Sequence, residues 1–253
     1  MKIAVAGKGG VGKTTLSAVL SRLYRDEGRN VLAIDADSNP NLATSLGVPM
    51  KDITPLSEQK ELVEERTKTK LGGFGAVFKL NPRVDDIAQK YAVEHDNIKL
   101  LVMGTVKMGE SGCACPANVL VKALLTHLLL AEKDVVICDM EAGVEHLGRG
   151  TAKAVDAMII VVEPGRRSTE TANHIHELAQ DLGIGNVFVV GNKVRTEKER
   201  EFIKDQVTMD VLGYIPYDER IIEADMKGEP PFFPELIAEV KTIKENLETK
   251  IEK

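Results

Sequence analysis

Residues 7–15 of this 253-residue chain read GKGGVGKTT and directly follow the apolar run KIAVA at residues 2–6. The stretch contains the pattern G-x-x-x-x-G-K-[ST] between an expected strand and an expected helix, which is the context that a phosphate-binding loop requires. Its glycines let backbone N–H groups turn toward anionic oxygens, while the helix directs its positive end at the same charge. Lys13 is expected to bridge the β- and γ-phosphates of a nucleotide, and the Thr14 hydroxyl to ligate Mg²⁺. The residues expected to bind nucleotide in this loop are Gly9, Gly10, Val11, Gly12, Lys13, Thr14 and Thr15.

Short apolar runs with the character of buried strands recur along the rest of the chain and alternate with amphipathic stretches. The expected strands cover residues 2–6, 31–34, 99–103, 134–139, 157–162, 186–190 and 211–214. This rhythm predicts one α/β domain over residues 1–253, with a mostly parallel central sheet of about seven strands flanked by helices. Residues 48–97 interrupt it, because they are rich in charge and contain a glycine cluster. We expect them to form a largely helical, polar insertion with a flexible segment near residues 68–75.

Composition narrows the classes of function. Apolar residues make up 43% of the chain, and 33 Lys and Arg face 39 Asp and Glu, for a net charge of −6. A chain this acidic is a poor candidate for binding nucleic acid through phosphate neutralisation. No apolar run reaches the length of about 18 residues that a membrane span needs, and three cysteines cannot form a secreted disulfide framework. We therefore expect a cytoplasmic protein with neither nucleic acid nor membrane as a partner.

The second lysine of the loop, Lys8, makes the motif more specific. GKGGVGKTT closely resembles the deviant Walker A motif of the MinD/ParA-type ATPases, a family that includes the nitrogenase iron protein. The resemblance implies a P-loop fold of the MinD-like (SIMIBI) type and an ATPase that dimerises when nucleotide is bound. It also implies that Lys8 reaches across the dimer to the nucleotide of the other subunit. There, a cation supplied in trans would stabilise the charge that spreads over the γ-phosphate during its transfer.

Two acidic segments match the same family. Residues 34–42 read IDADSNPNL, and by resemblance Asp37 positions the attacking water and belongs to the magnesium site. Residues 135–143 read VVICDMEAG, which resembles the Walker B and switch II segment, with Asp139 holding Mg²⁺ and Gly143 sensing the γ-phosphate. A structural or metal-proximal role for Asp35 is as plausible as a catalytic one. The expected catalytic set is thus Lys8, Lys13 and Asp37, and the expected magnesium set is Thr14, Asp37 and Asp139.

Two later segments indicate which base is bound. In the family, the positions of Asn192 and Lys193, within VVGNKV at residues 189–194, and of Pro216, within IPYDER at residues 215–220, border the adenine. The guanine-type pattern N-K-x-D is not met, because Asn192 and Lys193 are followed by Val194 and Arg195. The resemblance therefore favours ATP and ADP as ligands.

The cysteines point to a transition metal. Residues 112–116 read GCACP, between an expected strand and an expected helix, whereas Cys138 is expected in the core. Cys113 and Cys115 offer two thiolates per chain, so a two-fold dimer would offer four. Four thiolates suit a zinc site, a nickel site or an iron–sulfur cluster.

This C-x-C motif resembles that of the CooC-type maturation ATPases, which serve nickel insertion into carbon monoxide dehydrogenase. The resemblance implies an ATP-hydrolysing homodimer that binds Ni²⁺ or Zn²⁺ at Cys113 and Cys115, with the apo form of that nickel enzyme as client. Nickel in transit and a structural zinc stay open, and so do two other functions. One is an iron–sulfur electron donor similar to the nitrogenase iron protein. The other is a MinD/ParA-type positioning or partitioning ATPase, which the mixed, slightly acidic polar face of residues 235–253 disfavours.

Overall fold

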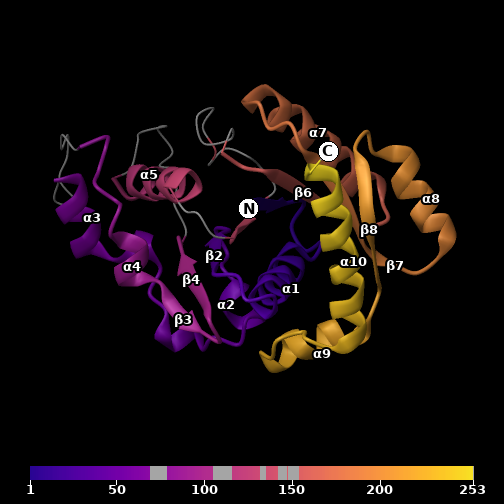
Figure 1. Ribbon diagram of the computed structural model, residues 1–253, viewed down its shortest axis with the longest axis horizontal. Coiled ribbons are helices and arrows are strands. Elements are labelled where there is room, and N and C mark those ends of the chain that lie inside the picture. Colours follow the sequence, from indigo (N-terminus) through magenta and orange to yellow (C-terminus); the bar gives the residue numbers. More distant parts are fainter. Residues whose placement is uncertain (69–78, 105–115, 132–134, 142–146, 148–153, 253) are drawn as a thin grey trace.

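The central element of the protein is a mostly parallel sheet (Figure 1), and the expected phosphate-binding loop follows its inner strand β1. The computed structural model describes residues 1–68, 79–104, 116–131, 135–141, 147 and 154–252. Within these residues the sheet has eight strands in the order β3-β4-β2-β5-β1-β6-β7-β8. Only the β3–β4 pair is antiparallel. The strands are β1 (Lys2–Ala6), β2 (Val31–Ala36), β3 (Val93–His95), β4 (Ile98–Val102), β5 (Val135–Met140), β6 (Ala157–Val162), β7 (Val187–Val194) and β8 (Asp210–Pro216).

Helices cover both faces of this sheet (Figure 1). The described helices are α1 (Lys13–Asp26), α2 (Leu42–Ser45), α3 (Lys60–Thr67), α4 (Ile87–Tyr91), α5 (Pro116–Ala131), α7 (Arg166–Leu182), α8 (Glu197–Gln206), α9 (Glu219–Lys227) and α10 (Pro234–Ile251), with 3₁₀ turns η1 (Met50–Asp52) and η2 (Leu56–Glu58). Side chains alternate along β1, so that Ile3 and Val5 pack with α1 and α10, whereas Ala4 and Ala6 belong to the core beneath α5 and α7. None of the described helices is apolar and long enough to cross a membrane.

The predicted α/β class and the parallel sheet are confirmed, but the count of about seven strands misses β3. This strand is only three residues long and lies inside the segment expected to be helical. It pairs with β4 through a tight hairpin whose two turn residues, Asp96 and Asn97, both have positive φ values of 50° and 59°. Asp and Asn tolerate this conformation better than most residues. The Asp-Asn pair before an apolar run was therefore the feature of the sequence that could have predicted this hairpin turn.

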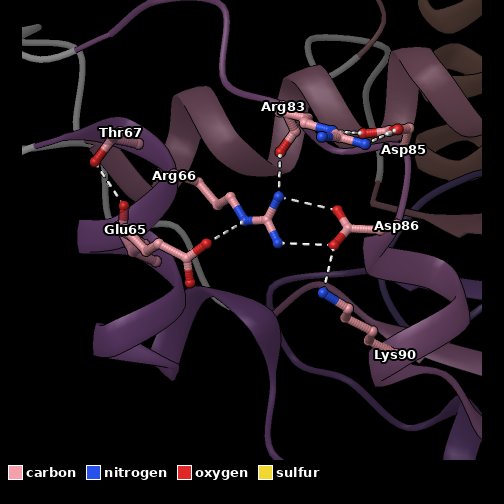
Figure 2. Close-up of polar contacts among 8 residues, drawn as sticks. Glu65, Arg66, Thr67, Arg83, Asp85, Asp86 and Lys90 are labelled. Carbon is pink, nitrogen blue, oxygen red and sulfur yellow. Dashed lines mark hydrogen bonds and ion pairs between the residues drawn. The ribbon is translucent and has the colours of Figure 1, made fainter.

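The segment 48–97 is anchored to the domain by apolar and ionic contacts. Leu56, Leu62 and Ile87 are buried in the core that α5 covers. Figure 2 shows Arg66 of α3 holding the Asp86 carboxylate with two parallel hydrogen bonds of 2.9 Å. Lys90 of α4 lies 2.6 Å from the same carboxylate, and the hydrogen bond from Arg66 holds the pKa of Asp86 well below its usual range. A fork-like arginine pair fixes direction as well as distance, so α3 and α4 keep one mutual orientation.

A buried lysine fastens the C-terminal helix to α1. The Lys244 side chain on α10 is only 3% exposed, and its Nζ lies 2.8 Å from Glu27, just beyond α1, and 2.9 Å from Glu248. The same ammonium lies 4.6 Å from the centre of the Tyr24 ring. Each charge of this cluster thus has a partner, as a buried cation requires.

Replacing Lys244 with Met should lower the free energy of unfolding by about 1–2 kcal/mol, because both carboxylates lose their partner but can regain water at the surface. Urea titrations followed by circular dichroism would measure the change. Lys241→Met, at an exposed position on the same helix, is the matched control and should stay within about 0.5 kcal/mol of the wild type. Equal stability of the two variants would contradict the proposed fastening.

Candidate nucleotide site

The phosphate-binding loop between β1 and α1 has a backbone that depends on glycine. Gly7, Gly10 and Gly12 have φ values of 141°, 79° and 98°. A Cβ at Gly7 would lie 2.4 Å from the carbonyl oxygen of Val161 on β6, which is closer than real atoms approach. The chain can therefore leave β1, turn and enter α1 only with glycine at this position.

Two residues near the end of β7, Asn192 and Lys193, hold the phosphate-binding loop through hydrogen bonds to its backbone. Asn192 is 4% exposed and donates a hydrogen bond of 2.7 Å from Nδ2 to the carbonyl oxygen of Val11. Its Oδ1 accepts a bond from the backbone N–H of Lys193. Lys193 has a left-handed backbone with φ 58°, and its Nζ donates to the Gly10 carbonyl oxygen at 2.6 Å. The adenine contacts expected of both residues stay a prediction, whereas the structure shows them supporting the phosphate loop.

The loop after β2 brings an acidic side chain to Lys13. Lys13 Nζ lies 3.5 Å from Asp37 Oδ2, and the Lys13 side chain is 6% exposed. Asp35 is fully buried and accepts hydrogen bonds from the backbone N–H groups of Asp37 at 3.2 Å and Leu42 at 2.9 Å. Burial raises the pKa of Asp35 to about 6, although these backbone donors act in the opposite direction. Asp35 therefore holds the shape of the loop that presents Asp37, which supports the structural one of its alternative roles.

Asp139 near the end of β5 is a buried carboxylate, with the Thr14 hydroxyl and Lys13 close to it. It pairs in register with Asp35 of β2 and Val5 of β1, so it lies beside the start of the phosphate loop. Within the described residues neither of its oxygens has a hydrogen-bond partner. Burial raises its pKa to about 7, while the nearby Thr14 hydroxyl and Lys13 act against this shift.

An orphaned buried carboxylate next to a threonine hydroxyl fits a hard divalent cation, because oxygen ligands of this kind suit Mg²⁺. Magnesium keeps several waters and takes phosphate oxygens, so it needs few protein ligands.

A cavity of about 480 Å³ is lined by residues of the phosphate loop, of the loop after β2 and of the end of β7, whereas Asp139 is not among its lining residues. Of the residues expected to touch nucleotide, the following line it: Gly9, Gly10, Gly12, Lys13, Thr14, Thr15, Asn192, Lys193 and Pro216, together with Asp37. The sequence analysis did not predict that α9 and the segment after it would also line this cavity. Their lining residues are Ile221, Ile222, Asp225, Glu229 and Pro231. The volume is of the size that a nucleotide-like ligand needs. The only feature of the sequence that indicated these lining residues was that they follow Pro216, which was itself expected to border the adenine.

Several expected site residues lie outside this cavity. Val11 is buried beneath the loop, and the half-buried Lys8 is not among the cavity residues. Cys113, Cys115 and Gly143 lie outside the described residues. Cys138 belongs to the core as expected, where burial raises the pKa of its thiol far above the usual range. A thiol of this kind stays protonated and does not act as a ligand or nucleophile.

A phosphate-binding loop after the first strand, acidic side chains at two neighbouring strand ends and the cavity that this loop lines define an α/β P-loop ATPase. The chain belongs to the CobQ/CobB/MinD/ParA nucleotide binding domain family, whose model matches residues 2–232. The resemblance to MinD/ParA-type ATPases that GKGGVGKTT carries is thereby confirmed.

Two relatives are similar to this chain in sequence, whereas a solved structure is similar to it in fold at low sequence identity. The carbon monoxide dehydrogenase accessory protein CooC of Rhodospirillum rubrum is 49% identical over 232 residues, which cover 90% of this chain and 88% of that protein. An uncharacterized ATP-binding protein of Methanocaldococcus jannaschii is 48% identical over 233 residues, covering 91% and 90%. The solved structure of the septum site-determining protein MinD from Pyrococcus horikoshii, complexed with Mg-ADP, matches with a TM-score of 0.65 at 22% identity and covers 96% of this chain and 95% of that one. This last likeness shows the fold alone.

The raised pKa of Asp139 predicts a pH-dependent stability. The pKa rises from its ordinary value of 3.8 to about 7 on folding. The folded chain therefore binds this proton more tightly than the unfolded chain, and the associated stability is lost as the pH rises from about 4 through about 7. Without nucleotide and with EDTA, Asp139→Asn should be more stable than the wild type at pH 8 by about 1–3 kcal/mol, and the gap should close toward pH 5.

Urea unfolding at a series of pH values measures this difference. Asp205→Asn, at an exposed site on α8, serves as the control and should follow the wild type at every pH. An Asp139→Asn variant that is less stable than the wild type at pH 8 would refute the buried, unpartnered carboxylate.

Proposed function

We propose that the cavity binds Mg·ATP and that Lys13, Thr14, Asp37 and Asp139 carry its hydrolysis. What supports this is that one 480 Å³ cavity gathers the phosphate loop, Asp37 and the Asn192–Pro216 side of the site. Lys13 is the cation for the β- and γ-phosphates, and Thr14 and Asp139 would hold Mg²⁺, with Asp37 beside them. The metal would supply charge neutralisation between the two phosphate groups.

The Lys13–Asp37 ion pair indicates how binding and hydrolysis are linked. At 3.5 Å the two side chains neutralise each other in the chain without nucleotide. The oxygens of a triphosphate carry more charge than one carboxylate and compete for Lys13. Asp37 is then free to orient a water molecule for in-line attack on the γ-phosphorus, from which the β-phosphate oxygen of ADP leaves.

Lys8 would act on a second copy of the chain. It lies in the phosphate loop but is not among the residues that line its own cavity. The MinD/ParA resemblance assigns such a lysine to the nucleotide of a partner subunit. A homodimer that closes over ATP would therefore complete the site, with Lys8 stabilising the charge of the transferred phosphoryl group.

The two lysines should fail in different ways. Lys13→Ala should weaken ATP binding at least tenfold, because the main cation on the phosphates is lost. Lys8→Ala should bind ATP within about threefold of the wild type, yet lose ATP-dependent dimerisation and at least about tenfold in turnover. Titration with a fluorescent ATP analogue, light scattering and phosphate release measure the three properties. Lys51→Ala, at an exposed lysine in η1, is the control. Normal turnover of Lys8→Ala would remove the argument for a lysine acting in trans.

We infer further that this ATPase is an accessory factor for a nickel enzyme, with carbon monoxide dehydrogenase as the client. The observation that carries this step is the 49% identity to CooC over 90% of the chain. The C-x-C motif also supports this step, because it resembles that of the CooC-type ATPases. Its second cysteine, Cys115, directly precedes Pro116, where α5 begins. Two chains related by a two-fold axis would offer four thiolates, a set that suits Ni²⁺ or Zn²⁺.

The cysteines should bind one metal ion per dimer. Cys113→Ser and Cys115→Ser should each lower Ni²⁺ and Zn²⁺ binding at least tenfold, because a serine hydroxyl stays protonated at neutral pH and is a poor ligand for these metals. ATP affinity should stay within about twofold, because the phosphate loop lies elsewhere in the sequence and contains no cysteine. Affinity for metal should fall as the pH is lowered, because the thiolates take up protons.

Equilibrium dialysis with each metal, combined with light scattering, measures stoichiometry and assembly together. One metal per monomer, unchanged in the double serine variant, would refute the shared site. A broad visible absorption of anaerobically purified protein would instead favour the iron–sulfur alternative. The client is tested separately by asking whether the wild type with ATP raises nickel-dependent activation of apo carbon monoxide dehydrogenase, and whether the double serine variant does not.

A further inference from the structure

A contact outside the nucleotide cavity joins the loop that follows β2 to the end of β5. Glu141 Oε1 accepts a hydrogen bond from the backbone N–H of Ser38 at 3.2 Å and a second one from the Ser38 hydroxyl. Ser38 directly follows Asp37 in the chain, and Glu141 is two residues beyond Asp139. One carboxylate oxygen thus links the two segments that carry the acidic residues of the site.

Neither member of this contact is placed to touch a nucleotide. Ser38 and Glu141 are absent from the residues that line the 480 Å³ cavity. They instead line a separate hollow of about 40 Å³, together with Gly104 after β4 and Lys122 of α5. The loop that Glu141 holds is thus the route by which we expect it to affect ATP hydrolysis.

The backbone around Asp37 is fixed on both sides. Before it, the Asp37 N–H donates to Asp35 Oδ1 at 3.2 Å, and after it, Ser38 donates twice to Glu141. Asp37 Oδ1 accepts a bond of 2.9 Å from the Asn39 N–H, so the direction of its carboxylate follows the course of this loop. Without Glu141, the loop loses the two hydrogen bonds from Ser38 to this carboxylate, and we expect the Asp37 carboxylate to sample a wider range of positions. Displacements of about 1 Å can already cost a large factor in rate.

We propose that Glu141 is a positioning residue for ATP hydrolysis, which holds Asp37 in line with the attacking water by accepting both hydrogen bonds of Ser38. The inference rests on the role proposed for Asp37. Because an acceptor oxygen is all that this contact requires, an amide at position 141 can replace the carboxylate in part, whereas a methyl group cannot. Glu141 takes no proton from the water and contacts neither ATP nor its phosphates.

Three variants test this role. Glu141→Ala should lower kcat about tenfold, the size expected for a lost charge-assisted hydrogen bond, and leave KM and ATP affinity within about twofold. Glu141→Gln should recover kcat to within about threefold of the wild type. Ser38→Ala, which keeps its backbone N–H, should fall between the two. Glu201→Ala, an exposed glutamate on α8 near the far edge of the sheet, is the matched control (Figure 1).

Combining Glu141→Ala with Asp37→Asn separates this inference from the proposed function. Single-turnover hydrolysis of radiolabelled ATP should show Asp37→Asn slowed strongly and the double variant no slower, because Glu141 acts through the group already lost. If Asp37→Asn turns over normally, the role of Asp37 itself is wrong. If Asp37→Asn is slow but Glu141→Ala is normal, or if the two losses multiply, Glu141 is not a positioning residue for Asp37. A Glu141→Ala variant that raises KM as much as it lowers kcat, or a Glu141→Gln variant as slow as Glu141→Ala, also overturns the inference.

Discussion

Unbalanced negative charge at the carboxyl ends of β2 and β5 is the constraint around which the site is built. Asp35 and Asp139 are fully buried on neighbouring strands and in register, and Asp37 lies two residues beyond Asp35. Lys13 approaches Asp37 at 3.5 Å, and its single positive charge does not balance three carboxylates. Burial raises the pKa values of Asp35 and Asp139 to about 6 and 7, and the charges of neighbouring carboxylates act in the same direction. Such a site is destabilising when empty and favours a divalent cation together with its phosphate ligands, so the demand for Mg·nucleotide follows from electrostatics.

The surroundings of this charge are divided between rigid and adjustable parts. Asn192 and Lys193 of β7 donate hydrogen bonds to carbonyl oxygens of the phosphate loop, and a Cβ at Gly7 or Gly12 would collide with Val161 or Asn192. The contacts that hold the loop after β2, in contrast, include hydrogen bonds to the side chains of Asp35 on one side and Glu141 on the other. A fixed phosphate cradle beside a loop that depends on a few hydrogen bonds is an arrangement that can respond to the γ-phosphate without loss of the fold.

The fold by itself says little about the client. A structure with a TM-score of 0.65 at 22% identity belongs to MinD, a septum site-determining protein, while a sequence relative at 49% identity is an accessory protein of carbon monoxide dehydrogenase. The likeness to MinD extends to the fold alone, so the fold does not identify the client. Differences in function then reside in what the loops carry, and here the feature outside the ATPase motifs is the C-x-C before α5.

The sequence by itself determined the fold class, the phosphate loop and the acidic strand ends, because each depends on residues close together in the chain. Val, Ile and Leu runs mark strands buried on both faces, and G-x-x-x-x-G-K-T fixes one local geometry. Only the tertiary structure decided what depends on contacts between distant segments. In the structure, Asn192 donates a hydrogen bond to Val11, and Asp35 holds the loop that carries Asp37. Residues of α9 line one side of the cavity. Ser38 and Glu141, 103 positions apart in the chain, are joined by a hydrogen bond. No local pattern encodes such pairs, because hydrogen bonds and burial depend on which strand ends the topology brings together.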